Sequence, residues 1–457
     1  MSFNSLIFAL FFLPITLLFY HISKKKYKNT ILLLASILFY LWGSSKAILI
    51  VFVSILINYI LAIIMEKFPK HKKQVLFLTI ATNILILIYY KYTNFFIGIL
   101  NKNFTPLKIL VPLGISYITF QQISYVVDVY REKSKVQKNF INFALYILFF
   151  PKIIAGPITQ YNQIDKQLTD RKLNLDQFEE GIYRFCIGLG KKIIIASTIQ
   201  KVVDEIFKIA PHNLGLEMAW LGMLAYTLQI YFDFSGYTDM AIGIAKMFSF
   251  NLPENFDKPY TSHSIGEFWR RWHITLSFFL RDYIYIPLGG SRCSKKRILF
   301  NTFVIFFLSG FWHGANYTFI IWGLYHCFFV AIEKFGVKAK IINKLPKIIT
   351  QFTAFIIVGI GWVFFRAENL HYALSFVKAM VNIKHIKPLT TLSLSIDTQF
   401  IIVFIFALII SIIPKLHLRE RNKIFFSLAR VLSICIFVYS LAIVTTGSFM
   451  PFIYFKF

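Results

Sequence analysis

One histidine of this sequence stands at the end of a long apolar run. His313 follows about fourteen mostly apolar residues, and the stretch from Ser309 to Asn316 is rich in small side chains. An ionisable side chain in such a run is costly and suggests function. Because a neutral imidazole takes a proton from a hydroxyl near pH 7, we predict that His313 is a proton acceptor, with Trp312 and Asn316 helping to bind the substrate. A hydrogen-bonded structural histidine is the alternative, and it is the interpretation that we favour for His326.

Two carboxylates lie in the apolar stretch from Tyr231 to Asp239. Asp233 stands four residues before Tyr237, and Ser235 stands four residues before Asp239, so each pair shares one face of a helix. We interpret Asp233 and Asp239 as residues that bind the substrate or orient a catalytic group. A structural ion pair with the arginine-rich segment further along the chain is the alternative.

That segment, Glu267–Ser277, places Arg270 and Arg271 between two tryptophans and also contains His273. Guanidinium groups donate two parallel hydrogen bonds to phosphate, and neighbouring aromatic rings stack on planar groups. The segment therefore predicts a binding surface for a phosphate-bearing acyl donor such as coenzyme A. Anchoring among lipid headgroups by an aromatic belt explains the same residues equally well.

The composition indicates a membrane protein. Of the 457 residues 57% are hydrophobic and only 15% are charged, well below the usual quarter of a soluble domain. The net charge of +28, from 49 basic and 21 acidic residues, fits basic loops beside membrane spans and anionic lipids. Nucleic-acid binding is not expected, because no soluble domain is available to carry it. The four cysteines have neither metal-site spacing nor a disulfide pattern, so we expect no metal and no bound cofactor.

Long apolar runs predict an all-α polytopic membrane protein, because about 20 apolar residues cross the hydrocarbon core as a helix. We expect roughly eleven to thirteen transmembrane or re-entrant elements in a single domain over residues 1–457. Two apolar runs separate the lysine clusters 24–28 and 67–73, so both clusters are expected on the cytoplasmic side. Prolines and a glycine in Phe149–Pro157 predict a broken helix buried in protein. Residues 251–297 are too polar to cross and are predicted to form interfacial helices.

Taken together, these segments resemble the membrane-bound O-acyltransferase (MBOAT) family, and the similarity is greatest to its bacterial branch that includes the alginate O-acetylation membrane protein. The matching segments are Tyr231–Asp239, Asn255–Tyr260, Phe268–Ser277, Arg281–Gly290 and Trp312–Gly314. The resemblance implies a funnel of helices with a tunnel through the membrane. It also implies a signature histidine at His313 and a second conserved histidine at His273. Members that D-alanylate teichoic acids share the fold, but their second signature run is usually less like Tyr231–Asp239.

The last six residues, 452–457, resemble the C-terminal tail of this branch and a short partner peptide of the D-alanylation systems. By that similarity Tyr454 is a candidate acyl carrier. A phenol beside a histidine base is a nucleophile that can be activated. An aromatic anchor at the membrane interface is the alternative.

The function that we expect is O-acylation, with acetyl as the acyl group, of a cell-envelope polysaccharide across the bacterial inner membrane. The co-substrate is a cytoplasmic thioester, either acetyl-CoA or an acyl carrier protein. His313 removes the proton of the acceptor hydroxyl, and His273 polarises or orients the carbonyl of the acyl donor. The resemblance also implies an extracytoplasmic partner, an SGNH-type acyltransferase or a similar envelope protein.

Three alternatives remain open at this point. D-alanyl transfer to teichoic acids uses the same fold. A transporter or flippase also uses buried Asp and His as a proton relay, although the inverted repeats that favour it are not visible in this sequence. A non-catalytic scaffold for envelope assembly is the third, and it predicts that His313 and Tyr454 are replaceable.

Overall fold

The computed structural model describes residues 2–44, 47–101, 103–335, 345–383, 395–413 and 423–446. Every named element in these ranges is helical, apart from one isolated β-bridge between Phe256 and Trp272. The all-α prediction is therefore confirmed. The chain divides into two compact units: unit 1 comprises Met1–Cys186 and Tyr237–Glu254, and unit 2 comprises Ile187–Gly236 and Asn255–Phe457. The single domain expected over residues 1–457 stays a prediction.

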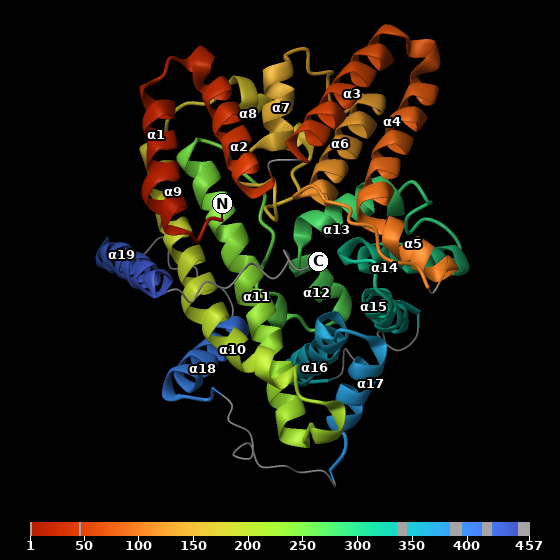
Figure 1. The fold of residues 1–457 in the computed structure, drawn as a ribbon, viewed down its shortest axis with the longest axis vertical. Coiled ribbons are helices and arrows are strands. Elements are labelled where there is room, and N and C mark those ends of the chain that lie inside the picture. The colour runs from red at the N-terminus through yellow and green to blue at the C-terminus, as the bar shows by residue number, and fades with distance from the viewer. Residues whose placement is uncertain are drawn as a thin grey trace. The chain divides into compact units, whose positions relative to one another are not determined.

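Unit 1 is a bundle of apolar helices (Figure 1). Helix α3 (Ile48–Lys67) packs against α4 (Lys72–Leu87), α4 packs against α6 (Ile115–Tyr130), and α2 (Lys28–Ser44) packs against α7 (Phe140–Leu148). Helix α2 begins inside the first lysine cluster, which lengthens the short apolar run that follows it. The remaining elements of unit 1 are η1 (Phe8–Phe12), α1 (Leu13–Ile22), η2 (Lys25–Tyr27), η4 (Pro69–His71), η5 (Ile88–Tyr92), α5 (Thr93–Leu100), η6 (Tyr161–Gln163), α8 (Asp165–Thr169), most of α9 (Leu175–Gly190) and the end of α11 (Leu216–Met247).

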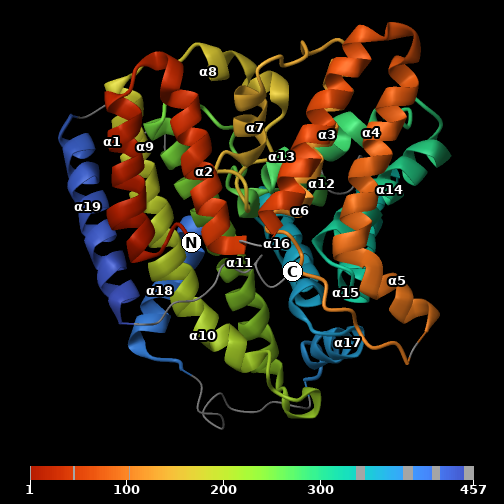
Figure 2. The same ribbon diagram turned by 45° about the horizontal axis from the view of Figure 1, so that its top comes forward.

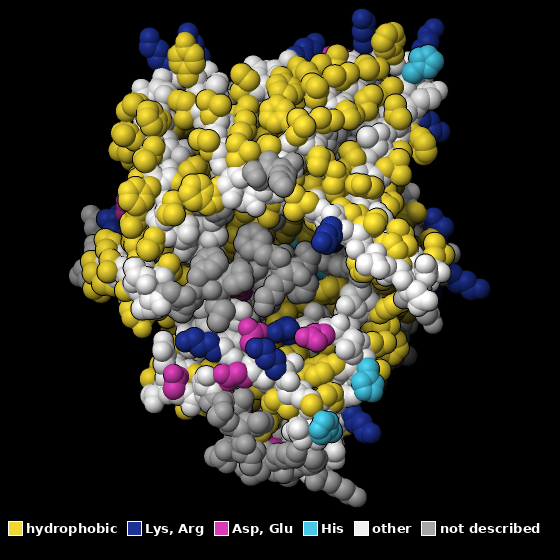
Figure 3. Space-filling view, viewed as in Figure 1, with side chains coloured by type: hydrophobic (Ala, Val, Ile, Leu, Met, Phe, Trp, Pro, Cys, Tyr) yellow, Lys and Arg dark blue, Asp and Glu magenta, His cyan; other side chains and the backbone are white. Residues whose placement is uncertain are grey.

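The two lysine-rich turns of unit 1 lie at the same end of this bundle. The α1–α2 and α3–α4 connections both lie at the top of Figures 1 and 2. In Figure 3, Lys and Arg side chains lie at the top of the view, at the end of the bundle that carries these two turns. A wide band of hydrophobic side chains lies below them over α1–α4. This arrangement agrees with the expectation that both lysine clusters face the same side of the membrane.

The predicted broken helix is present in unit 1. Helix α7 ends at Leu148, and the residues from Phe149 to Gly156 form buried turns instead of continuing the helix. Lys152 in these turns is fully buried, donates a hydrogen bond of 2.7 Å to Gln121 Oε1, and lies 4.1 Å from the ring centroid of Tyr146. The irregular backbone is therefore enclosed by protein, as a segment at membrane depth requires.

Unit 2 contains the second half of the chain. Helix α15 (Tyr317–Phe335) packs against α14 (Lys295–His313), α16 (Lys347–Arg366) and α12 (Ile265–Arg271), and α12 packs against α13 (Ile274–Leu280). The other elements are the end of α9, η7 (Lys191–Ala196), α10 (Ser197–Ile206), η8 (Pro211–Asn213), the first part of α11, η9 (Pro259–Thr261), η10 (Arg281–Tyr285), α17 (Leu370–Ala379), α18 (Thr398–Ile412) and α19 (Lys423–Thr445). Residues 251–297 thus contain short helices, and their position at a membrane interface stays a prediction.

Five described stretches are long and apolar enough to cross a membrane, and two further apolar helices are shorter. The long stretches are Ile48–Lys67, Pro69–Leu100, Tyr317–Phe335, Lys347–Arg366 and Leu428–Thr445. Other runs expected to span form helices that are too short or too polar to be recognised by length and composition, such as α6 and α14. The number of spans therefore stays a prediction, whereas the polytopic membrane character is supported.

Candidate active site

A strained turn in unit 2 holds His273. Residues 255–257 run antiparallel to residues 271–274, with Asp257 N donating to Arg271 O and Ile274 N donating to Asn255 O, both at 3.0 Å. His273 lies between α12 and α13 with a backbone φ of +44°, a conformation that a side chain other than glycine adopts at a cost. The two backbone hydrogen bonds keep the chain in this conformation, and they fix where the imidazole can lie.

Asn255 determines which ring nitrogen of His273 carries the proton. Asn255 Oδ1 accepts from the backbone N of Thr275 at 3.2 Å and from its hydroxyl at 2.9 Å, and it lies 3.1 Å from His273 Nδ1. The backbone N–H can only donate, so the atom that faces it is the carbonyl oxygen of the amide. Nδ1 of His273 must therefore be protonated, and in the neutral ring Nε2 carries the lone pair. Burial lowers the pKa of His273 to about 3, which keeps the ring neutral.

The two adjacent arginines that we predicted to bind phosphate have different surroundings. Arg271 forms an ion pair of 2.8 Å with Glu267 and donates a hydrogen bond of 3.0 Å to the Thr261 hydroxyl. Arg270 is exposed and has no ion pair with any described residue. Only Arg270 therefore presents a guanidinium group that is available to an anion.

Arg270 opens onto a cavity of about 630 Å³ in unit 2, which we call the basic cavity. Its walls come from α12, α13, η10, α14 and α15, and most of the lining is apolar or aromatic, with Trp269 and Phe306 among its members. Three cationic side chains, Arg270, Arg281 and Lys334, lie along it. A cavity of this size with few polar groups is typical of a small-molecule site.

His273 also lines the basic cavity. It is 1% exposed and is the only histidine among the described lining residues. The acidic lining residue Glu333 accepts hydrogen bonds from the backbone N–H groups of Ile265 and Gly266 at the start of α12. The basic cavity thus combines cations for an anionic ligand with an imidazole in its wall.

Trp312 connects the two histidines. Its ring centroid lies 6.0 Å from that of His273 and 4.9 Å from that of His313. His313 is the last residue of α14 and is 5% exposed. Asn316 lies in the turn that follows, where its Oδ1 accepts from Thr318 N at 3.1 Å at the start of α15. The structure therefore brings His273, Trp312 and His313 together, and Asn316 holds the turn beside them.

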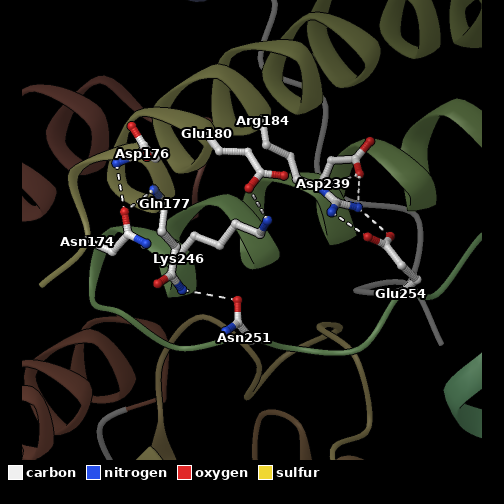
Figure 4. A network of polar contacts seen from close by, with 9 residues as sticks. All are labelled: Asn174, Asp176, Gln177, Glu180, Arg184, Asp239, Lys246, Asn251 and Glu254. Carbon is white, nitrogen blue, oxygen red and sulfur yellow. Dashed lines mark hydrogen bonds and ion pairs between the residues drawn. The ribbon is translucent and has the colours of Figure 1, made fainter. Parts of the chain in front are cut away.

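The two predicted carboxylates have basic partners from earlier in the chain. In unit 2 Asp233 forms an ion pair with Lys192, and each side chain is 2% exposed. In unit 1 Asp239 lies 2.8 Å from Arg184, which also contacts Glu254 (Figure 4). A structural ion pair was one of our two interpretations, and ion pairs are present. The partner expected for them, the arginine-rich segment further along the chain, was wrong, since both cations precede the carboxylates.

Several residues of this region were missed or lie outside the structure. Asn255 and Arg281 stand in segments that match the family, yet nothing in their spacing singled them out. Lys334 and Glu333 had no signal, because they line the basic cavity only through the packing of α15 beside α12. Tyr454 and the tail 452–457 lie outside the described residues.

The helical domain thus contains a basic cavity with one buried histidine in its wall and a second buried histidine one tryptophan away. The family model of MBOAT, the membrane-bound O-acyltransferase family, matches residues 37–339. The chain therefore belongs to this family, as its motifs indicated. It is a membrane-integral enzyme, an O-acyltransferase.

Curated relatives agree with this assignment. The chain is 42% identical to the "Probable alginate O-acetylase AlgI" of Pseudomonas aeruginosa over 83% of this chain and 75% of the relative. It is 38% identical to the peptidoglycan O-acetyltransferase of Helicobacter pylori over 83% of this chain and 80% of the relative. It is 31% identical to the teichoic acid D-alanyltransferase of Bacillus subtilis over 58% of this chain and 71% of the relative.

Proposed function

We propose that this enzyme takes an acetyl group from a cytoplasmic thioester, acetyl-CoA, and passes it across the bacterial inner membrane for O-acetylation of a cell-envelope polysaccharide. The observation that carries the proposal is the basic cavity of about 630 Å³ with His273 in its wall and His313 one tryptophan away. The relatives with the higher identity and coverage are named for O-acetylation of alginate and of peptidoglycan.

The lining of the basic cavity suits coenzyme A. Its phosphates match the cations Arg270 and Lys334, since charge-assisted hydrogen bonds to phosphate are the strong ones, whereas Arg281 is already paired with Asp282 at 2.6 Å. Its long, mostly apolar arm matches the aromatic walls, which also keep water from the thioester. An acyl carrier protein carries the same type of arm and is the second candidate donor.

The lining favours acetyl over D-alanyl as the transferred group. A D-alanyl group carries an ammonium, which a carboxylate would stabilise. Glu333 is the one carboxylate among the described lining residues, and it already accepts hydrogen bonds from Ile265 N and Gly266 N. D-alanyl transfer is therefore the second candidate function.

His313 serves in this proposal as the base. It takes the proton from the acceptor hydroxyl, the oxygen bonds to the thioester carbonyl carbon, and the carbon–sulfur bond breaks. The thiolate that leaves takes the proton back, so no net charge remains on the protein. The acceptor is either the phenol of Tyr454, which then hands the acetyl group to an extracytoplasmic SGNH-type transferase, or a hydroxyl of the substrate itself.

The decisive experiment supplies radiolabelled acetyl-CoA to inside-out membrane vesicles that contain the full-length enzyme, its partner and the polymer. His313→Ala should abolish label in the polymer while the amount of protein in the membrane stays unchanged. His326→Ala is the matched control, because His326 is also fully buried and contacts the lining residue Trp269 at 5.0 Å, but does not itself line the basic cavity. Labelled polymer from the His313→Ala enzyme would refute the role of His313, and normal labelling by Tyr454→Phe would exclude an obligatory acyl-tyrosine.

A further inference from the structure

Aromatic rings enclose His313 in unit 2. The centroid of its imidazole lies 5.2 Å from Trp322 of α15, 5.0 Å from Phe365 of α16 and 4.9 Å from Trp312. The planes of these rings are inclined to the imidazole by 88°, 78° and 74°, so each contact is edge to face. Trp322 and Phe365 are each 1% exposed, which keeps water out of this aromatic box.

Such a box has a larger effect on a cation than on a neutral ring. A histidine that takes a proton becomes an imidazolium, and a cation without water around it is costly. The face of an aromatic ring is electronegative and attracts a cation within about 6 Å of its centroid, and tryptophan is the strongest of the aromatic side chains in this respect. The attraction therefore grows as the proton arrives, and only such differential stabilisation raises a rate.

We propose that Trp322 stabilises the imidazolium form of His313 that arises when His313 takes the proton of the acceptor hydroxyl. The inference rests on the proposed function, in which His313 is the base. Trp322 acts through His313 and is therefore a positioning residue. The cation exists only between two proton transfers, from the acceptor hydroxyl to His313 and from His313 to the leaving thiolate. An aromatic ring suits such a short-lived charge, because it does not hold the proton permanently as a carboxylate would.

The same cluster contains a control for Trp322. Trp362 of α16 is also 1% exposed, and its ring stacks on that of Trp322 at 5.7 Å with an angle of 24°. Among the described ring contacts Trp362 touches His326, at 6.5 Å, and not His313. Replacing either tryptophan removes a similar volume from the same core, but of these two only Trp322 contacts the proposed base.

The test uses fluorinated tryptophans, because fluorine withdraws electron density from the ring face and changes the ring size little. Full-length enzyme in lipid nanodiscs is prepared with tryptophans that carry no, one, two or three fluorine atoms. Its partner and the polymer are added as acceptor of the acetyl group, and release of free thiol from acetyl-CoA is measured. We expect log kcat to fall steadily with the number of fluorine atoms, by about ten-fold in total, while KM changes less than about two-fold. All seven tryptophans are labelled in this way, so the background variants Trp322→Phe and Trp362→Phe locate the effect.

The dependence on fluorine should become shallower in Trp322→Phe, in which Trp312 still contacts His313, and should keep its full slope in Trp362→Phe. A series without slope in the parent enzyme, or an equal slope in the Trp322→Phe background, would overturn the role of Trp322 and leave the proposed function intact. A parent enzyme that releases no thiol from acetyl-CoA would overturn the proposed donor, and the role of Trp322 with it. Elution profiles and thermal midpoints of both variants show whether a loss of rate reflects folding.

Discussion

Replacing Arg270 by alanine should weaken the binding of acetyl-CoA by about ten-fold, whereas replacing the adjacent Arg271 should leave it unchanged. Arg270 is exposed at the basic cavity and has no ion pair with a described residue. Arg271 is already engaged by Glu267 at 2.8 Å and by Thr261 at 3.0 Å. The two substitutions remove the same charge one residue apart, so their difference reports the local geometry and not the net charge of the enzyme.

The magnitude follows from the surroundings of each guanidinium. A hydrogen bond to a charged group contributes about 1.5–3 kcal/mol where water is excluded, and exposure of Arg270 reduces this to about 1.4 kcal/mol, or ten-fold in the dissociation constant. The Arg271–Glu267 pair is one third and one fifth exposed, so its loss should cost only about 0.5–1 kcal/mol of folding stability. Arg270→Lys should recover part of the affinity, because lysine keeps the charge but not the paired donors.

Equilibrium binding of radiolabelled acetyl-CoA to the purified enzyme in detergent measures these constants. Raising the salt concentration from 0.05 M to 0.5 M should weaken the parent enzyme more than Arg270→Ala, since one screened charge contact is already missing in the variant. The reasoning would be refuted if Arg271→Ala lost as much affinity as Arg270→Ala, or if Arg270→Ala bound acetyl-CoA as tightly as the parent. An intact thermal midpoint in each variant is the control for folding.

Three further predictions concern stability. Asp233→Asn should destabilise the enzyme by about 3–5 kcal/mol, because it removes the carboxylate that faces the buried Lys192. Asp239→Asn should cost only about 1 kcal/mol, because Glu254 also contacts Arg184, the partner of Asp239. Unfolding in denaturant measures both changes in free energy. Gly310→Ala should lower the thermal midpoint, because the added Cβ would lie 2.3 Å from a carbonyl oxygen of α15. The pKa of His273 is about 3 in the folded protein and 6.5 in the unfolded chain, so acidification from pH 7 to pH 5 protonates only the unfolded form and removes about 2 kcal/mol of folding stability. In unfolding titrations, His273→Asn should therefore reduce the dependence of the unfolding free energy on pH. An unchanged dependence would contradict the burial of a neutral ring.

The sequence predicts much of this fold because a bilayer leaves few choices. Apolar runs must become helices, and prolines in such a run must be enclosed by protein, as at Phe149–Gly156. The two lysine clusters allowed a check on the membrane topology. Two apolar runs lie between them, and two membrane crossings return the chain to the side from which it started. What the sequence does not contain is the point at which each helix ends: α2 takes in residues of the lysine cluster, and α6 and α14 are shorter or more polar than a simple span.

The candidate site could be predicted in part. The three residues His273, Trp312 and His313 were recognised from their types and neighbours, and the structure places Trp312 in contact with both histidines. The difference between Arg270 and Arg271 could not be predicted, because both stand in one helical turn and only the packing of α12 decides which of them faces the basic cavity. Hydrogen bonds between distant segments, such as those of Asn255 to the turn at His273, leave no periodic signal in a sequence.

The tautomer of His273 changes the role that its position suggested. A histidine that polarises the carbonyl of the acyl donor must donate a hydrogen bond to it, yet the nitrogen that carries the proton, Nδ1, already faces Asn255 Oδ1. In the neutral ring Nε2 can only accept. Unless His273 is protonated, which burial opposes, it serves an N–H or O–H group and not a carbonyl oxygen. His313 is then the histidine to which we assign the transient positive charge, because the rings of Trp322 and Phe365 lie against it at 5.2 and 5.0 Å. The two histidines are therefore assigned different roles because their rings have different neighbours: an amide oxygen lies against His273, and aromatic rings lie against His313.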